Sequence, residues 1–158
     1  MISKVNIEKL NLVKLLHAKF FLPSGMYFLI YRSETTTIPL EEELGLILTH
    51  ARNRNKTMDI TGMLLSFDRK FLQLLEGEEK NVKKVYESIC KDDRHINIKL
   101  LKDGHIDKRL FPGWSMSFRP VTKQEIADEP AYKDIYKPGS EGAIEVVSLF
   151  NLLRGKGK

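Results

Sequence analysis

The sequence predicts an α+β domain in which two helices cover one face of a single sheet. Strand-like and helix-like stretches alternate over residues 26–118 in the order βαββαββ. Each helix-like stretch carries one apolar stripe, so each needs one apolar surface to cover. The 158 residues, 42% of them hydrophobic, suffice for one compact domain with a core, and we therefore expect one functional site.

The first half of the domain predicts a strand, a helix and a hairpin. The stretch "MYFLIYRSE" is apolar and aromatic, as in a central strand. After Pro39, three glutamates suit the positive end of a helix dipole, and an apolar face follows them. This face consists of Leu40, Leu44, Ile47, Leu48 and Ala51. The stretch "ITGMLLSFDRKFLQLLEG" is typical of two strands joined by a tight turn between Phe67 and Lys70.

The second half predicts a helix and two strands. "EEKNVKKVYESICKDDRH" has an amphipathic pattern, whose apolar stripe is Val82, Val85, Ile89 and Cys90. "INIKLLKDG" has strand character, and "WSMSF" alternates, which places Trp114, Met116 and Phe118 on one face of a last strand. The complete order is that of a ferredoxin-like plait with one additional strand.

Two segments flank this domain. Residues 1–25 predict a short helix that ends at Pro23, and they are either an added leader or the result of a misassigned start before Met26. Residues 119–158 predict irregular connectors followed by a helix over "AIEVVSLFNLL". We expect this C-terminal helical cap to cover an apolar surface, which is either the free face of the sheet or a second subunit.

Composition and charge exclude several classes of protein. The 26 basic residues are interspersed with 21 acidic ones, so the net charge of +5 is more typical of solvated faces than of a nucleic-acid-binding surface. No apolar run approaches the roughly 18 residues of a membrane span. The single cysteine, Cys90, cannot form an internal disulfide. We therefore expect a cytoplasmic protein without a membrane anchor, in which Cys90 is a buried thiol.

The common catalytic and metal-binding motifs are missing. The sequence has no CxxC, HExxH, GxxxxGK[ST] or GxSxG motif, and its four histidines are scattered. Asp92 and Asp93 lie beside Arg94 at a helix end, where capping and ion pairing are commoner than acid–base catalysis. The sequence therefore predicts neither a metal site nor an enzyme.

Three hydrogen-bonding residues lie inside otherwise structural elements. Tyr31 ends the first strand, Asn55 lies near the end of the first helix and Gln73 lies in the third strand. Because the first and third strands of a plait are central neighbours, the side chains of Tyr31 and Gln73 can meet. Each residue also has an ordinary interpretation, respectively as a core aromatic, a helix C-cap and an outward strand residue. A neutral amide exchanges a donor for an acceptor when it rotates by half a turn.

Five stretches carry a resemblance to a known family. They are "YRS" at 31–33, "ARNRNKTMDITGMLL" at 51–65, "FLQLLEGEEKNV" at 71–82, "DDRHINI" at 92–98 and "FPGWSMSF" at 111–118. In order and spacing they resemble the BLUF family of blue-light photoreceptors, which bind FAD. The resemblance spans residues 26–118 and is to the short, stand-alone bacterial type.

The resemblance implies roles for individual residues. Tyr31 matches the photoactive tyrosine of the family and Gln73 its switching glutamine. Trp114 and Met116 match a pair on the last strand that relays the signal. The positions that match contacts with FAD are Tyr31, Ser33, Ile47, Asn55, Gln73, Ile89, Arg94 and His95.

The family's photochemistry implies how these residues act. Light drives proton-coupled electron transfer from Tyr31 and rearranges the hydrogen bonds of Gln73, and the flavin absorption shifts to the red. The implied output is a protein–protein interaction with an unidentified partner, in a homo-oligomer. Two alternatives remain. One is a non-photoactive plait that is a small enzyme or binds a ligand, and the other is a nucleic-acid-binding plait that uses Trp114 and Phe118.

Overall fold

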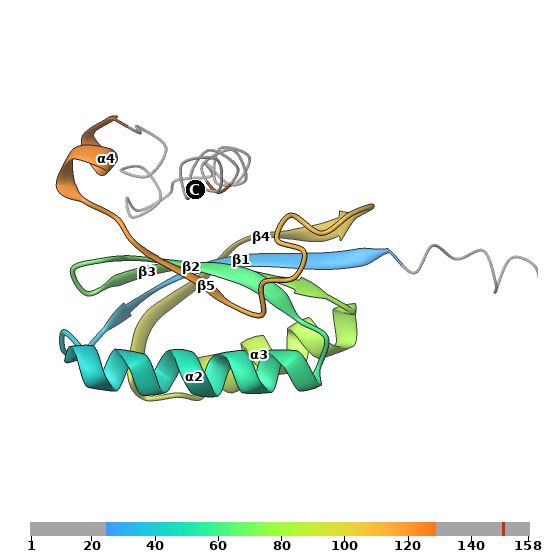
Figure 1. Ribbon diagram of the computed structural model, residues 1–158, viewed down its shortest axis with the longest axis horizontal. Coiled ribbons are helices and arrows are strands. Elements are labelled where there is room, and N and C mark those ends of the chain that lie inside the picture. Colours follow the sequence, from blue (N-terminus) through green and yellow to red (C-terminus); the bar gives the residue numbers. More distant parts are fainter. Residues whose placement is uncertain (1–24, 129–149, 151–158) are drawn as a thin grey trace, which may run out of the picture.

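The computed structural model of the protein describes residues 25–128 and Phe150. These residues form a five-stranded sheet of order β4-β1-β3-β2-β5, with helices α2 and α3 side by side on one face and α4 on the other side (Figure 1). The elements are β1 (Met26–Thr35), α2 (Glu41–Thr57), β2 (Thr61–Phe67), β3 (Lys70–Gly77), α3 (Glu79–Cys90), β4 (His95–Ile106), β5 (Ser117–Pro120) and α4 (Lys123–Asp128). Neighbouring strands are antiparallel except β5, which pairs parallel to β2. The predicted α+β class and plait order are confirmed.

The central strands are buried on both faces because their side chains alternate between two apolar clusters. On β1, Leu29 and Tyr31 face the cluster under the helices, whereas Phe28 and Ile30 face the opposite cluster. The opposite cluster includes Phe111 and Phe150, whose rings meet edge to face with their centroids 6.0 Å apart. The sheet thus separates a helix-covered side from a second apolar side.

The hairpin of β2 and β3 is held together by a close approach at Gly62. A Cβ atom at this position would lie 2.0 Å from the carbonyl oxygen of Leu74, far inside contact distance. The Gly62 N–H also donates to the carbonyl of Trp114 at 3.0 Å. The glycine therefore lets β2 pass between β3 and the segment that precedes β5.

A buried carboxylate fixes the connection between β4 and β5. Glu76 is fully buried on β3, and its carboxylate accepts hydrogen bonds from the backbone N–H groups of Leu110 and Phe111, each at 2.7 Å. It also accepts one from the hydroxyl of Thr61 at 2.9 Å. These three donors satisfy the Glu76 carboxylate and hold the segment between β4 and β5 against the sheet.

The predicted start of the last strand is wrong. β5 starts at Ser117, so Trp114 and Met116 precede it. Met116 belongs to the cluster under the helices, whereas the ring of Trp114 lies 6.1 Å from that of Phe111 in the opposite cluster. The physical reason is that the carbonyl of Ser115 accepts a hydrogen bond from the side chain of Asn55 at 2.7 Å, and not from a neighbouring strand.

The expectation that Cys90 is buried is also wrong. Cys90 is exposed at the last residue of α3, whereas Val82, Val85 and Ile89 of the same predicted stripe are buried. Cys90 follows Ile89 by one residue, which turns its side chain about 100° away from the stripe.

Several predictions concern segments beyond the described residues. The leader helix of residues 1–25 lies outside them except for Gly25, as does the C-terminal helix of residues 143–153 except for Phe150. In the part of the chain that the structure describes, no helix has the length and apolar character needed to cross a membrane.

Candidate functional site

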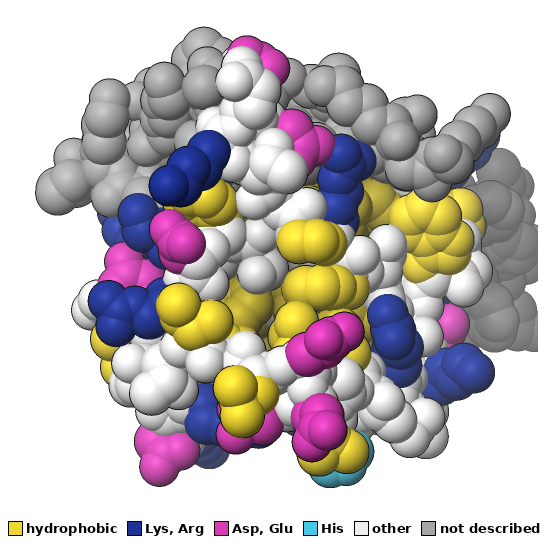
Figure 2. All heavy atoms as spheres, turned by 60° about the vertical axis from the view of Figure 1, so that its left-hand side comes forward, with side chains coloured by type: hydrophobic (Ala, Val, Ile, Leu, Met, Phe, Trp, Pro, Cys, Tyr) yellow, Lys and Arg dark blue, Asp and Glu magenta, His cyan; other side chains and the backbone are white. Residues whose placement is uncertain are grey.

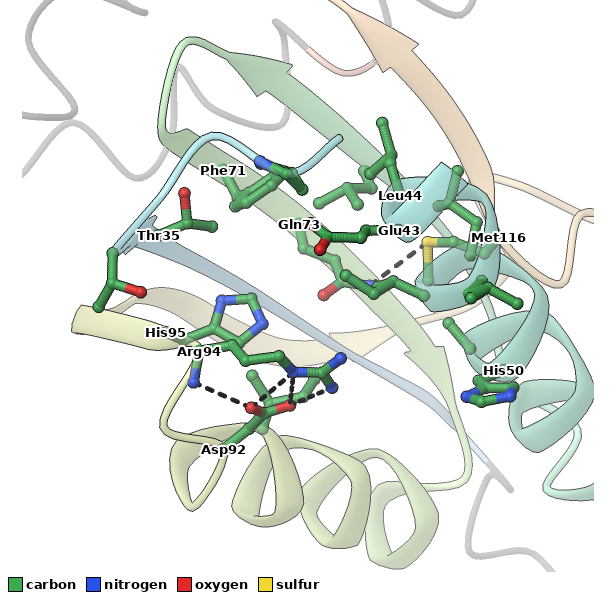
Figure 3. A pocket seen from close by; sticks show the side chains of 18 of the residues that line it. Thr35, Glu43, Leu44, His50, Phe71, Gln73, Asp92, Arg94, His95 and Met116 are labelled. Carbon is green, nitrogen blue, oxygen red and sulfur yellow. Dashed lines mark hydrogen bonds and ion pairs between the residues drawn. The ribbon is translucent and has the colours of Figure 1, made fainter. Parts of the chain in front are cut away.

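A tyrosine and a glutamine meet on the helix-covered face of the sheet. Tyr31 of β1 lies directly opposite Gln73 of β3 in the register of these strands. The Tyr31 hydroxyl donates a hydrogen bond to Oε1 of Gln73. Nε2 of Gln73 in turn donates to the sulfur of Met116 at 3.3 Å (Figure 3). All three side chains are buried, so a phenol, an amide and a thioether form a chain that is shielded from water.

This chain of side chains lies at the wall of a cavity of about 730 Å³. Helix α2 forms one wall, the sheet the floor, and the C-terminal end of α3 a second wall (Figure 3). The apolar residues that line it include Leu44, Ile47, Leu48, Ala51, Leu64, Phe71 and Ile89. The cavity therefore has apolar walls and a few aimed polar groups, which is the usual composition of a cofactor site.

Charged side chains line the cavity beside the end of α3. The Arg94 guanidinium donates to the Asp92 carboxylate, with Nη2 and Oδ2 2.5 Å apart, and holds the pKa of Asp92 at about 2 (Figure 3). Nδ1 of His95 lies 3.1 Å from the Ser33 hydroxyl oxygen, and burial lowers the pKa of His95. This part of the cavity thus presents one neutralised ion pair and an imidazole that is uncharged near pH 7.

The electrostatics of Tyr31 keep its proton in place. Burial raises the pKa of Tyr31 far above its usual value, and the positive charge of Arg54 opposes this only partly. The ring of Tyr86 lies 5.3 Å from that of Tyr31, and burial raises the pKa of Tyr86 to about 12. The neutral phenol is therefore the strongly favoured form of Tyr31.

The predicted site residues fall into two groups. Those that line the cavity are Tyr31, Ile47, Gln73, Ile89, Arg94, His95 and Met116. The others are not among its lining residues. The Ser33 hydroxyl contacts the ring of His95. Asn55 is buried and its amide donates to the carbonyl of Ser115, and Trp114 is 41% exposed.

Sequence reasoning missed several lining residues, among them Arg54 and His50 on α2 and Phe71 on β3. For Arg54 a signal was available. The apolar stripe of α2 runs through Leu44, Ile47 and Ala51, and its next member at helical spacing is Arg54. A charged residue in line with an apolar stripe marks a surface that is not ordinary core.

Residues 26–117 match the family described as BLUF, sensors of blue-light using FAD. The chain belongs to the BLUF family. This confirms the resemblance seen in the sequence, and it identifies the chain as a member of a family of blue-light photoreceptors that bind flavin.

Two relatives illustrate how the BLUF domain is used elsewhere. The chain is 40% identical over 83 residues to the blue light- and temperature-regulated antirepressor BluF of Escherichia coli (strain K12), a match that covers 52% of this chain and 21% of that protein. It is 28% identical over 137 residues to the photoactivated adenylate cyclase subunit alpha of Euglena gracilis, covering 82% of this chain and 13% of that protein. The chain thus spans a small part of these relatives.

Two solved structures match most of their own length. The dark-state structure of BlrB, a BLUF protein, has a TM-score of 0.70 and 26% identity, and the match covers 85% of this chain and 99% of that one. The photo-activated state of BlsA has a TM-score of 0.66 and 30% identity, covering 79% of this chain and 91% of that one. The fold is therefore that of these BLUF structures.

The residues of the cavity fit a flavin. A flat tricyclic ring needs two apolar walls, and Ile47 of α2 and Ile89 of α3 supply apolar side chains from different helices. The ring also needs hydrogen-bonding groups at its polar edge, and the Gln73 amide and the Arg54 guanidinium line the same cavity. The volume is within the range of about 300–1,000 Å³ that is typical of ligand sites.

Proposed function

We propose that this BLUF protein senses blue light through FAD held in the cavity under α2, with Tyr31 and Gln73 as its switch. The observation that carries the proposal is the hydrogen bond from the buried Tyr31 hydroxyl to Oε1 of Gln73 at the cavity wall. The family description, which names FAD, supports FAD over FMN as the cofactor.

Residues from both helices and from β4 would hold the cofactor. Ile47 and Ile89 would enclose the ring system, and Gln73 would hydrogen bond to its polar edge. Arg94 and His95 would lie toward the ribityl and phosphate part, and their location at the cavity wall supports this role. Ser33 would act indirectly by orienting His95. Asn55 has its amide on the carbonyl of Ser115, so contact with the cofactor would require that amide to turn.

The bound flavin supplies absorption of blue light and, once excited, an acceptor for one electron and one proton. Tyr31 gives up both together and takes both back, which suits a phenol whose pKa burial has raised. While the hydroxyl is altered, Gln73 is free to rotate and to exchange its Oε1 and Nε2 positions. The net result is a changed hydrogen-bond pattern without a lasting covalent bond.

The rotated amide changes what Met116 contacts. Nε2 of Gln73 donates to the Met116 sulfur before rotation, and an amide oxygen would replace it afterwards. Each altered hydrogen bond contributes about 0.5–1.5 kcal/mol, enough to shift a two-state equilibrium by a factor of about 2 to 10. The segment from Trp114 to Met116 is the element that we expect to shift.

The output that we propose is a contact with another protein in the cytoplasm, without enzymatic activity of this domain. Support comes from the E. coli relative, which is an antirepressor, and from Trp114, an aromatic side chain that is 41% exposed beside the shifting segment. Homo-oligomerisation is part of this proposal, because large exposed apolar residues such as Ile38 and Leu40 lie on the surface. Figure 2 shows hydrophobic side chains gathered among charged ones on one face of the molecule.

The first experiment is an absorption spectrum of the purified protein, taken in the dark and under blue light. We expect a structured flavin band that shifts to the red and recovers in the dark, and chromatography of the released cofactor should identify FAD. The Tyr31→Phe variant should keep the flavin but lose the red shift. Tyr86→Phe, which alters the neighbouring ring, is the matched control and should retain the shift. A normal photocycle in Tyr31→Phe would refute the switch, and a colourless protein that cannot be loaded with flavin would favour the ligand-binding plait.

A further inference from the structure

The charged side chains that line the cavity differ in whether a partner of opposite charge or a hydrogen-bond donor balances their charge. Glu43 accepts the backbone N–H of Leu40 at 3.1 Å in the first turn of α2, and Asp92 is paired with Arg94. Arg54 also lines the cavity, near the other end of α2 and eleven residues from Glu43, which is about 16 Å along the helix axis. Neither acid of the cavity therefore neutralises Arg54.

Arg54 contacts a neutral group. Its Nε and Nη2 atoms both lie 3.3 Å from Oδ1 of the Asn55 amide. Within residues 25–128 and Phe150, no carboxylate forms an ion pair with Arg54. Burial lowers the pKa of Arg54, which means that the surroundings disfavour its charge. An uncompensated, half-buried cation thus lines the same cavity as Tyr31 and Gln73.

We propose that Arg54 stabilises the electron-rich form of the bound flavin and so sets how readily the flavin accepts electrons. This inference rests on the proposed function, because it requires flavin in the cavity. A flavin that takes up two electrons and one proton gains a negative charge, and a fixed cation in a site shielded from water favours that charge. In the proposed light reaction the electron moves together with a proton and both partners stay neutral, so Arg54 acts on the anionic, two-electron-reduced flavin and not on the Tyr31 step.

The test is the midpoint potential of the flavin-loaded protein, measured by anaerobic titration with dithionite in the presence of a reference dye. Arg54→Gln removes the charge but keeps an amide N–H for Oδ1 of Asn55. We expect it to weaken the preference of the site for reduced over oxidised flavin about tenfold, which corresponds to about 30 mV toward negative potential for a two-electron couple. Arg54→Lys keeps the charge and should stay close to the wild type.

Lys56→Gln is the matched control, because Lys56 is an exposed cation on the same helix and does not line the cavity. Its midpoint potential should equal that of the wild type. An equal shift in Lys56→Gln would show that overall charge is responsible, and an unchanged potential in Arg54→Gln would overturn the proposal. So would equal losses of affinity for oxidised and reduced flavin in Arg54→Gln, because the charge would then act on both forms alike.

A second measurement on the wild type does not depend on the neutral variant being folded. The protein is loaded with an 8-hydroxyflavin, whose hydroxyl ionises to a coloured anion, and is titrated with pH. We expect the ionisation to occur at lower pH than in the free analogue, and an equal or higher pH would contradict the role of Arg54. A wild-type protein that binds no flavin refutes the proposed function as well, whereas a coloured, photoactive protein with an unchanged Arg54→Gln potential refutes only this inference.

Discussion

Helices α2 and α3 lie on the same face of the same sheet, but they differ in how closely they pack. The 12 residues of α3 bury Val82, Val85 and Ile89 against the strands. The 17 residues of α2 bury only Leu48 and Asn55, and its remaining apolar side chains line the cavity. We therefore expect the apolar stripe of α2 to be complementary to a ligand, whereas that of α3 is complementary to the core.

The largest expected effect tests the packed helix. Val85→Ala should lower the free energy of unfolding of the flavin-free protein by about 2 kcal/mol, because Val85 is only 1% exposed and the substitution leaves a cavity. Urea denaturation measures this loss. Ile47→Ala on α2 is the matched control and should lower it by less than about 1 kcal/mol. If the two losses were equal, the two helices would not differ as described.

The second prediction compares the same two variants in flavin affinity, where Ile47→Ala should have the larger effect. Ile47→Ala should weaken flavin binding about tenfold, or about 1.4 kcal/mol, because it removes part of an apolar wall. Val85→Ala should leave the affinity unchanged, since Val85 does not line the cavity. Quenching of flavin fluorescence on binding gives both dissociation constants. A weaker effect of Ile47→Ala than of Val85→Ala would argue against α2 as the wall of the binding site.

A smaller effect is expected from Gly45 within α2. A Cβ atom at this position would have no other atom within 4 Å, because this side of α2 faces open space. Gly45→Ala should therefore raise the free energy of unfolding by about 0.8 kcal/mol through helix propensity alone. Thermal denaturation checks the direction, and a destabilised variant would mean that α2 packs against something on that side.

The smallest prediction concerns the end of α3 and depends on pH. The pKa of Asp92 is lowered from 3.8 to about 2 by the hydrogen bonds from Arg94, so the ionised carboxylate stabilises the folded state above pH 3.8. This contribution is lost as the pH falls through about 2. Because the pair is partly exposed, Asp92→Asn should cost only about 0.5 kcal/mol at pH 7. Urea denaturation of both proteins at several pH values should show a constant difference down to about pH 4 that then disappears.

The meeting of Tyr31 and Gln73 could be predicted because strand order makes their two strands neighbours. Apolar periodicity gives the order of the elements, and in a plait that order places the first strand beside the third. The register then puts the two residues directly opposite each other. Their roles in photochemistry stay predictions, as do those of the other proposed flavin contacts.

The environment of Trp114 and Met116 could not be predicted, because it depends on contacts between distant segments. The carbonyls of residues 114–116 accept hydrogen bonds from Gly62, Asn55 and Arg52, which lie more than 50 residues earlier. Alternation in the sequence implies a regular strand and carries no information about such partners. The uncompensated charge of Arg54 could not be predicted either, since it depends on which acids lie near Arg54 in space.

Gly62 has a consequence for how this photoreceptor could vary or be retuned. In a saturation library, substitutions that change the cavity walls would yield folded proteins with altered colour or lifetime. Position 62 would return almost none, because any side chain there collides with the carbonyl of Leu74, one residue from Gln73. The backbone N–H of Gly62 also donates to the carbonyl of Trp114, two residues from Met116. The cavity walls can thus change by mutation. The distance between Gln73 and Met116 cannot, because position 62 between their segments has no room for even a methyl group.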